Sequence, residues 1–214
     1  FEISSIADAT SYPIKKPLKQ RLDILADHFQ STYNIKPLFF VRVPGRVNLI
    51  GEHIDYCGYA VCPMAIEQDI LIAVALSNDN VIHLTNLDSK YKNFHCNFKD
   101  ISVCIGDVDS GPDWYKYFLC GVKGALEVIP EECVPSGILA AVWGNIPPNS
   151  GLSSSSALVS AAVLLIVHAS QVNTFFRYSN LLYFYYRNYF ISIDFYSIEQ
   201  VYNIPCRQEK FLTI

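Results

Sequence analysis

The sequence predicts a soluble, globular fold in which helices and strands are mixed along the chain. Three observations predict it. Apolar positions recur at helical spacing in some stretches, short β-rich runs lie between those stretches, and charged residues interrupt the hydrophobic content throughout. The 214 residues are enough for one large domain or two small ones, built around a core of ordinary size.

Three helices are predicted. The first follows Pro17, which suits the first turn of a helix. The second opens at Pro112-Asp113, and Gly121 and Gly124 within it would allow close packing. The third is apolar and spans 157–167. Apolar positions at helical spacing in the first two helices are Leu18, Leu22, Leu25, Phe29, Trp114, Tyr117, Phe118, Val122, Ala125 and Leu126.

Four short strands are predicted from runs of β-forming residues that end in turn residues. The first run ends at Pro44-Gly45, and the polar turn at 77–80 separates the second run from the third. The strands are expected at 38–43, 70–76, 81–84 and 137–143.

The chain changes character at about residue 170. Beyond Ser170, aromatic residues, asparagine and isoleucine crowd together, and neither a helical nor a strand period persists. Arg177 and Arg187 interrupt this run too often for a membrane span. We therefore expect a helical segment (1–34), a domain (35–169) and a tail (170–214) that is not native to the fold. We expect that the tail comes from an alternative exon or from intron read-through. Transcript sequencing that shows a conserved exon junction beyond residue 170 would disprove this origin.

Net charge and cysteine content indicate which partners and which cell compartment to expect. The net charge of −4 argues against a nucleic-acid partner, which favours a basic stripe, but leaves room for a local anion site. The seven cysteines form no C-x-x-C pair, and no histidine lies at zinc-finger spacing from them. We expect reduced, buried thiols in a cytosolic protein.

A loop rich in glycine, proline and serine is predicted at 144–156, between a buried strand and an apolar helix. Small residues let the backbone approach a ligand, and the first turn of a helix leaves unpaired N–H groups that favour an anion. Four hydroxyls at 153–156 add donors for phosphate oxygens and one candidate ligand for magnesium. The alternative is a serine-rich helix cap with a flexible loop. A Walker-type P-loop is excluded, because no Gly-Lys-Ser/Thr follows.

A second polar loop is predicted at 43–56. It brings one guanidinium (Arg46), two carboxylates (Glu52 and Asp55) and an imidazole (His53) into ten positions. The last three offer the converging donors and acceptors that adjacent sugar hydroxyls need, and Arg46 could neutralise a developing phosphoryl charge. Two alternatives stay open. One is a metal site, although ligands this close in sequence rarely complete one unaided. The other is a structural turn held by ion pairs.

Together, the two loops resemble known kinases. The run Pro-Gly-Arg-Val-Asn-Leu-Ile-Gly-Glu-His-Ile-Asp-Tyr at 44–56 resembles the galactokinase signature, and 147–157 resembles the ATP loop of the GHMP small-molecule kinases. Both motifs occur in the order and separation of the galactokinase family, and the resemblance covers about 35–167. Ile54, the run at 56–59 and the run at 114–121 resemble the N-acetylgalactosamine kinase branch more than ordinary galactokinases.

This resemblance implies an α+β fold. Residues 35–169 would form the GHMP-kinase amino-terminal domain, a mixed sheet with helices packed on it, in a two-domain enzyme whose active site lies between the domains. The implied reaction transfers the γ-phosphoryl group of ATP to the anomeric hydroxyl of galactose or N-acetylgalactosamine. The implied ligands are a small sugar, ATP and Mg²⁺. We expect a cytoplasmic monomer that binds neither nucleic acid nor membrane.

The resemblance also implies residue roles. Arg46 would stabilise the transferring phosphoryl group. Glu52, His53 and Asp55 would hold sugar hydroxyls. Asn86 and Trp114 would line the nucleotide pocket. The ATP loop would bind the phosphates, with Ser155 as magnesium ligand, through Gly151, Leu152, Ser153, Ser154, Ser155 and Ser156.

One part of the family pattern is not found in this sequence. The family carries a Gly-Gly-Met-Asp-Gln segment, whose aspartate is the catalytic base, and a carboxy-terminal domain with a third glycine motif. Asp194 lacks the glycine context and is no substitute. Loss of a general base lowers the rate by about 100- to 10,000-fold, so we expect a truncated, inactive chain. The alternative function is a non-catalytic fragment that binds nucleotide or sugar. A GHMP kinase for mevalonate-type or homoserine substrates is disfavoured, because the polar loop at 43–56 suits a polyol.

Overall fold

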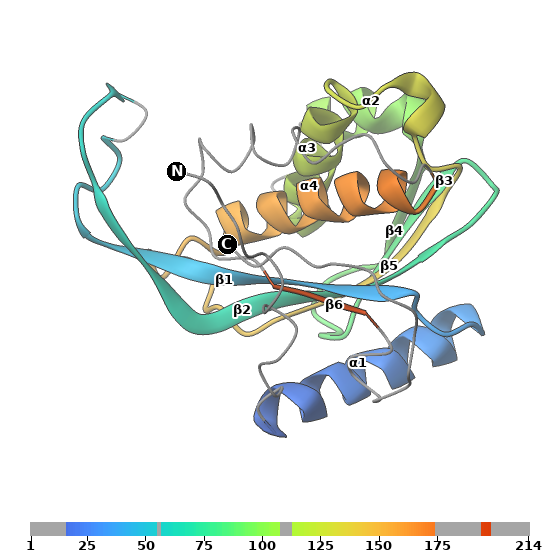
Figure 1. Ribbon diagram of the computed structural model, residues 1–214, viewed down its shortest axis with the longest axis horizontal. Coiled ribbons are helices and arrows are strands. Elements are labelled where there is room, and N and C mark those ends of the chain that lie inside the picture. The colour runs from blue at the N-terminus through green and yellow to red at the C-terminus, as the bar shows by residue number, and fades with distance from the viewer. Residues whose placement is uncertain (1–15, 55–56, 108–112, 174–193, 198–214) are drawn as a thin grey trace, which may run out of the picture.

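The computed structural model describes residues 16–54, 57–107, 113–173 and 194–197 (Figure 1). Its centre is one mixed sheet of six strands in the order β4-β3-β5-β2-β1-β6. Only the pairing of β3 with β5 is parallel. The strands are β1 (Phe39–Ile50), β2 (Cys62–Leu76), β3 (Val81–Asn86), β4 (Phe94–Asn97), β5 (Ile138–Gly144) and β6 (Asp194–Ser197).

Helices cover both faces of this sheet. In the view of Figure 1, the helix labelled α1 lies below the sheet, and those labelled α2, α3 and α4 lie above it. Short 3-10 turns at Phe98–Asp100 and Glu131–Cys133 precede α2 and β5. The helices are α1 (Lys16–Tyr33), α2 (Ile101–Gly106), α3 (Trp114–Leu126) and α4 (Ser154–Asn173). The predicted α+β class, a mixed sheet with helices packed on it, is confirmed.

The two cores follow from the period-2 alternation of side chains along the strands. In β1, Phe39, Val41 and Val43 join the larger core under α3 and α4. Phe40, which points to the other face, packs with Leu22 and Phe29 of α1 in the smaller core. The helix predicted in the segment 1–34 thus shares a core with the sheet of the predicted domain.

Two close contacts fix the positions of the helices, one between α1 and the sheet and one between α3 and α4. The Tyr33 hydroxyl of α1 donates to the carbonyls of His83 and Ala140, each at 3.1 Å, and burial raises the pKa of this phenol to about 12. On the other face, a Cβ built on Gly121 of α3 would lie 2.3 Å from the Val159 carbonyl oxygen of α4. The predicted close packing at Gly121 is therefore confirmed, because only glycine fits such an approach.

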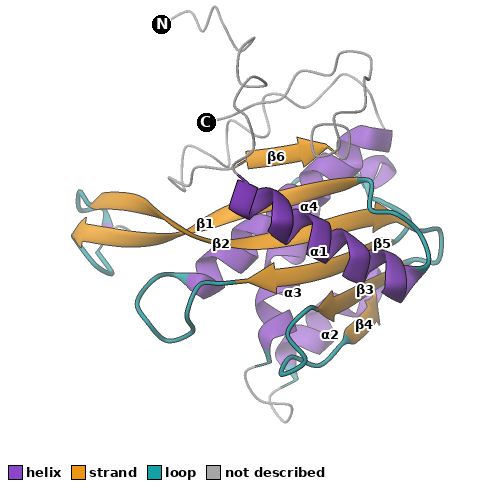
Figure 2. Ribbon diagram, turned by 90° about the horizontal axis from the view of Figure 1, so that it is seen from below, coloured by secondary structure: helices purple, strands orange, loops and turns teal. Residues whose placement is uncertain are grey.

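The main difference from the prediction is the length of β1 and β2. Both continue beyond the sheet as a two-stranded arm, which projects to the left in Figures 1 and 2. Residues 44–50, expected in a loop, pair with 62–69 instead, with irregularities after Pro44 and Asn48. The arm was not predicted, because most of its residues are exposed or only partly buried and therefore lack the regular alternation of apolar and polar residues that marks a half-buried strand.

Smaller differences concern the helices and the cysteines. Helix α4 begins at Ser154, three residues before the predicted start, so serines expected in the loop form its first turn. Tyr117, expected on the apolar face of α3, is 43% exposed. β4 and α2 were not predicted, since both are short. Against the expectation of burial, Cys57, Cys62 and Cys120 are exposed, while Cys96 and Cys133 are buried.

Most of the predicted non-native tail (170–214) lies outside the described residues. Within it, the structure describes the end of α4 and the strand β6, which pairs antiparallel with Phe39–Arg42 of β1. Among the described helices, none combines the length and the apolar character that a membrane crossing requires.

His168 of α4 makes the stability of the fold depend on pH. Its ring packs edge-on against Phe39, with 4.6 Å between centroids, and burial lowers its pKa from 6.5 to about 4. Between these values the unfolded chain binds the proton more readily, so stability is complete above pH 6.5 and falls as the pH drops toward 4. The loss should reach about 3 kcal/mol at most.

Urea unfolding at about pH 7 and about pH 4.5 measures this loss. His168→Gln, which cannot be protonated, should show a smaller difference between the two pH values than the unchanged chain. Equal differences in both proteins would contradict the assignment to His168.

Candidate functional site

The two predicted loops meet where the arm leaves the sheet. The backbone N–H of Arg46 donates to the carbonyl oxygen of Leu152 at 3.1 Å. A Cβ on the preceding residue, Gly45, would lie 2.8 Å from the same oxygen. Glycine at 45 is therefore required for β1 to approach the serine-rich loop this closely. Residues more than 100 positions apart in sequence become direct neighbours.

The side chain of Arg46 has an unmet hydrogen-bonding need. Its Nε is buried and has no hydrogen-bond partner among the described residues. A buried donor without a partner costs about 1–3 kcal/mol, and more when it is charged. Bound anions commonly satisfy guanidinium donors. The position of Arg46 beside the serine-rich loop therefore fits a phosphate-binding role.

The serine-rich loop has the backbone of an anion site. Asn149, Gly151 and Ser153 have φ values of 56°, 72° and 59°, so left-handed residues alternate with others. Such alternation turns successive N–H groups toward one side and forms a concave anion site. Ala157 N–H donates to the carbonyl of Ser153 at 3.0 Å, which starts α4. The N–H groups of the first turn have no partner within the helix and add to the same site.

The predicted phosphate-binding residues are placed together at this turn. Ser155 and Ser156 are exposed, and Leu152, Ser153 and Ser154 are half-buried. Gly151 is exposed beside them. Among the described residues, no cluster of three or more His, Cys, Asp or Glu could hold a metal ion. A cation at this loop would therefore depend on hydroxyls, phosphate oxygens and water, which suits Mg²⁺.

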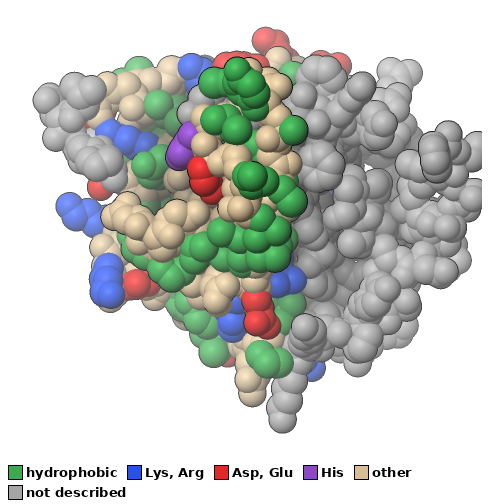
Figure 3. Space-filling view, turned by 90° about the vertical axis from the view of Figure 1, so that its left-hand side faces the viewer, with side chains coloured by type: hydrophobic (Ala, Val, Ile, Leu, Met, Phe, Trp, Pro, Cys, Tyr) green, Lys and Arg blue, Asp and Glu red, His purple; other side chains and the backbone are tan. Residues whose placement is uncertain are grey.

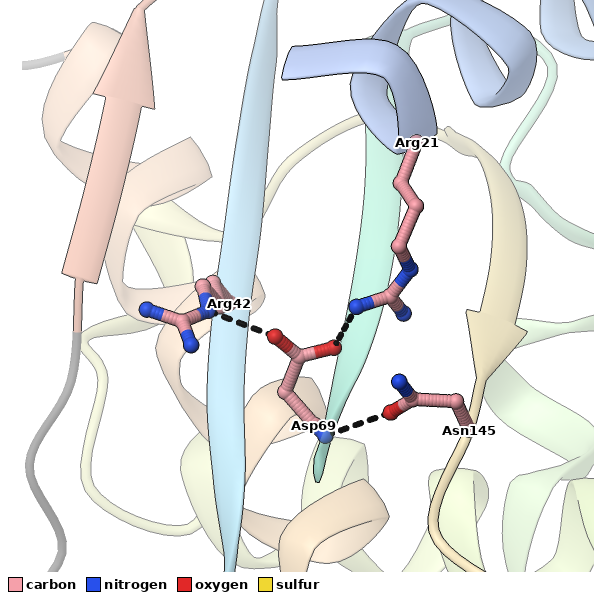
Figure 4. A network of polar contacts seen from close by, with 4 residues as sticks. All are labelled: Arg21, Arg42, Asp69 and Asn145. Atoms are coloured by element: carbon pink, nitrogen blue, oxygen red, sulfur yellow. Dashed lines mark hydrogen bonds and ion pairs between the residues drawn. The ribbon is translucent and has the colours of Figure 1, made fainter. Parts of the chain in front are cut away.

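The entry to the loop is held by a buried ionic network that sequence reasoning missed (Figure 4). The Asp69 carboxylate, 1% exposed, accepts from Arg21 Nη1 of α1 and Arg42 Nε of β1, each at 2.6 Å. The Asp69 N–H donates to Asn145 Oδ1 at 2.7 Å, and the Asn145 N–H donates to the Asp69 carbonyl at 3.1 Å. The available signal was a charged residue inside one predicted apolar strand (Arg42) and another directly before the next (Asp69), because buried charges are normally paired.

The predicted sugar-binding residues lie farther out, at the tip of the arm. Glu52 and His53 are both exposed, and His53 adopts a left-handed conformation with φ of 58°. Glu52 Oε1 accepts from the Asn48 N–H at 3.4 Å. Asp55 lies outside the described residues. The structure thus brings Arg46 to the serine-rich loop and places Glu52 and His53 beyond the end of β1.

Apolar side chains gather on the side of the molecule from which the arm projects. Figure 3, which views the side that faces left in Figure 1, shows hydrophobic side chains in a band across the surface. The arm and its tip contribute exposed residues to this side: Leu49, Ile50, Ile54, Tyr59 and Met64.

Asn86 and Trp114 lie near a separate hollow of about 350 Å³ at the end of β3. Asn86 and Tyr91 line the hollow, while Trp114 contacts its wall from α3. Trp114 Nε1 donates to the Lys92 carbonyl at 2.9 Å, and its ring lies 6.2 Å from that of Tyr91. Leu87 also lines the hollow, and its N–H donates to the carbonyl oxygen of Val142 in β5 at 2.9 Å. The hollow therefore adjoins the strand that leads into the serine-rich loop.

Comparisons with known proteins agree with this arrangement. The galactokinase galactose-binding signature matches residues 27–76, and the GHMP kinase N-terminal domain matches 121–175. Galactokinase of Schizosaccharomyces pombe is 32% identical over 216 residues, which cover 97% of this chain and 42% of that protein. Galactokinase of Candida maltosa is 35% identical, with 80% of each chain covered.

A solved structure supports the same assignment. Galactokinase of Lactococcus lactis, crystallised with galactose, matches with a TM-score of 0.55 and 28% identity, over 73% of this chain and 39% of that one. This chain spans less than half the length of the S. pombe relative. The shared motifs, fold and sequence identity show that the chain belongs to the galactokinase family of GHMP kinases.

Proposed function

We propose that this chain supplies two parts of an ATP-dependent kinase that phosphorylates the anomeric hydroxyl of galactose. One is the serine-rich loop at 144–156, here called the phosphate loop. The other is the two-stranded arm formed by 44–50 and 62–69 with its tip, here called the sugar arm. The observation that supports this most directly is the contact between the Arg46 N–H and the Leu152 carbonyl, at 3.1 Å. It joins the galactokinase signature to the anion-binding turn. A sugar held by the arm and a phosphate held by the loop would then meet near Arg46.

The proposed roles are divided among the serine-rich loop, Arg46 and the polar residues at 52–55. The N–H groups of the loop and of the first turn of α4 bind phosphate oxygens without a net positive charge. The guanidinium of Arg46, whose Nε is buried without a partner among the described residues, neutralises charge on the transferring phosphoryl group. Glu52, His53 and Asp55 bind and orient sugar hydroxyls. None of these residues is proposed as the general base that takes the proton from the sugar hydroxyl.

The nucleotide base is proposed to bind at the hollow beside β3. Asn86 offers an amide there, and the ring of Tyr91 offers an apolar face, with Trp114 packed behind it. The hollow adjoins the end of β5 through the Leu87–Val142 hydrogen bond. A nucleotide with its phosphates in the loop would therefore extend its base toward this side.

We also propose that the protein acts on small molecules as a cytosolic monomer, and that N-acetylgalactosamine is the alternative sugar. Ile54 and the run at 56–59 favour the second sugar, whereas the relatives named above are galactokinases. A difference between the two sugars lies at C2, so direct comparison of binding decides between them.

Titration calorimetry of this chain with ATP, galactose and N-acetylgalactosamine tests the proposal, together with a coupled assay for ADP release. Binding of ATP and of one of the two sugars is expected. Binding without turnover would favour a non-catalytic fragment, and turnover would contradict the expected loss of activity. Absence of both ATP and sugar binding would overturn the proposed function.

Magnesium dependence gives a separate prediction. Ser155 has an exposed side chain in the first turn of α4, where its hydroxyl can add one ligand to a Mg²⁺ ion held by ATP phosphates and water. Ser155→Ala should therefore weaken ATP binding about threefold or more in Mg²⁺ and leave it unchanged in a chelator. The control is Ser150→Ala, whose hydroxyl already donates to the Pro147 carbonyl at 2.6 Å. Equal effects of both variants would contradict the role of Ser155.

A further inference from the structure

We propose that Asn145 is a positioning residue, which holds the phosphate loop in its binding conformation before the nucleotide arrives. The inference rests on the proposed function, since it takes the loop at 145–153 as the nucleotide site. The sequence motifs assign no role to Asn145. We infer that it holds the loop through its two hydrogen bonds to Asp69.

The position of Asn145 explains how it acts. Pairing of β2 with β5 ends at Ile70 and Gly144. Asn145 extends this ladder by one step, because its N–H donates to the Asp69 carbonyl and its side-chain oxygen accepts from the Asp69 N–H. An amide side chain thus replaces a main-chain carbonyl as the acceptor. The main chain can then turn away from the sheet into the loop while both hydrogen bonds are kept. Figure 4 shows the one that Asn145 Oδ1 accepts.

Asp69 makes this point of attachment rigid. Its carboxylate is buried and paired with Arg21 of α1 and Arg42 of β1. The guanidinium of Arg21 also lies 5.0 Å from the ring centroid of Trp143, two residues before Asn145. The end of β5, directly before the loop, is therefore held by α1, β1 and β2.

The far end of the loop is held as well. The Leu152 carbonyl accepts from the Arg46 N–H, so the stretch from 145 to 152 is attached to β2 at one end and to β1 at the other. A loop that is ordered in advance loses less conformational entropy when its ligand binds. Release of one end should therefore weaken ATP binding even where the domain remains folded.

Two variants separate positioning from general stability. Asn145→Ala removes the acceptor that holds the loop, and leaves the ion pairs of Asp69 intact. Asp69→Asn removes the charge that Arg21 and Arg42 bind, and leaves the two backbone groups that bond to Asn145. Asn97→Ala is the matched control, because Asn97 makes an exposed side-chain hydrogen bond at the end of β4 remote from the loop.

The experiment measures ATP affinity, thermal unfolding and loop hydrogen exchange for each variant of the full chain. Asn145→Ala should weaken ATP binding about tenfold, which corresponds to about 1.4 kcal/mol, with galactose affinity unchanged. Asp69→Asn should lower the unfolding temperature more than Asn145→Ala does and weaken ATP binding less, because both hydrogen bonds between its main chain and Asn145 remain. Asn97→Ala should change neither. Equal ATP affinity in Asn145→Ala and the unchanged chain would overturn the proposal.

Hydrogen exchange without nucleotide keeps the test independent of the proposed function. The amides of residue 146 and of residues 149–153 should exchange faster in Asn145→Ala, and Asn145→Asp, which keeps an acceptor oxygen, should restore their protection. If the unchanged chain fails to bind ATP, the proposed function fails, and the exchange comparison still decides the role of Asn145. Unaltered exchange in Asn145→Ala would overturn that role.

Discussion

Gly121→Ala is expected to lower the free energy of unfolding by about 2–3 kcal/mol. A Cβ at this position would lie 2.3 Å from the Val159 carbonyl oxygen and 2.8 Å from the Ala162 Cβ. Both contacts belong to α4 and cannot be relieved by rotating a flexible side chain. The two helices would have to separate, and α4 packs on the sheet with the larger core. The loss arises from displaced core contacts.

The sign of this effect makes it a stringent test. In an exposed helix, replacing glycine by alanine stabilises by about 1 kcal/mol, because alanine is the better helix former. Gly106 at the end of α2 is the matched control, since a Cβ there would meet nothing within 4 Å. Urea unfolding should show Gly106→Ala to be neutral or stabilising. A similar result for Gly121→Ala would show that α3 and α4 are not in close contact.

Gly45→Ala is expected to weaken ATP binding by about tenfold or more and to destabilise the fold by about 1–3 kcal/mol. The added Cβ would lie 2.8 Å from the Leu152 carbonyl oxygen and 2.9 Å from Ile66 Cδ1. The Ile66 side chain can rotate away. The carbonyl can move only if the hydrogen bond from Arg46 N–H stretches or breaks, so the sugar arm and the phosphate loop would separate.

A double variant identifies which contact matters. Gly45→Ala combined with Ile66→Ala removes the side-chain clash and keeps the clash with the carbonyl. Calorimetry should find ATP binding as weak in the double variant as in Gly45→Ala alone. Recovery of the affinity in the double variant would assign the effect to Ile66 and contradict the role given to the Arg46–Leu152 contact.

Much of the fold could be predicted because its elements carry periodic burial. Leu22, Leu25 and Phe29 recur at helical spacing and all become buried in α1. The loop between β5 and α4 was predicted because glycine, proline and serine gather there between a buried strand and an apolar helix. Its role in binding phosphate stays a prediction, which depends on the helix N-terminus being open to an anion.

The parts that could not be predicted depend on contacts between distant segments. The arm is an exposed strand pair, so its residues show no alternation that separates a strand from a loop. Asp69 and Asn145 are 76 positions apart, and nothing local in either segment indicates that they bond. The sugar-binding roles of Glu52, His53 and Asp55 stay predictions, and Asp55 lies outside the described residues.

The place of β5 in the sheet has a consequence for how the protein is made. β5 is inserted between β2 and β3, although it follows both in the chain, and its pairing with β2 joins residues such as Leu76 and Ile138. Until β5 leaves the ribosome, β2 and β3 each expose an unpaired edge, which is prone to association with other chains. Such non-local pairing also slows folding. Because β5 leads directly into the serine-rich loop, a nascent chain gains its proposed ATP site only when the sheet closes, and retention on immobilised ATP is expected to select molecules that have completed folding.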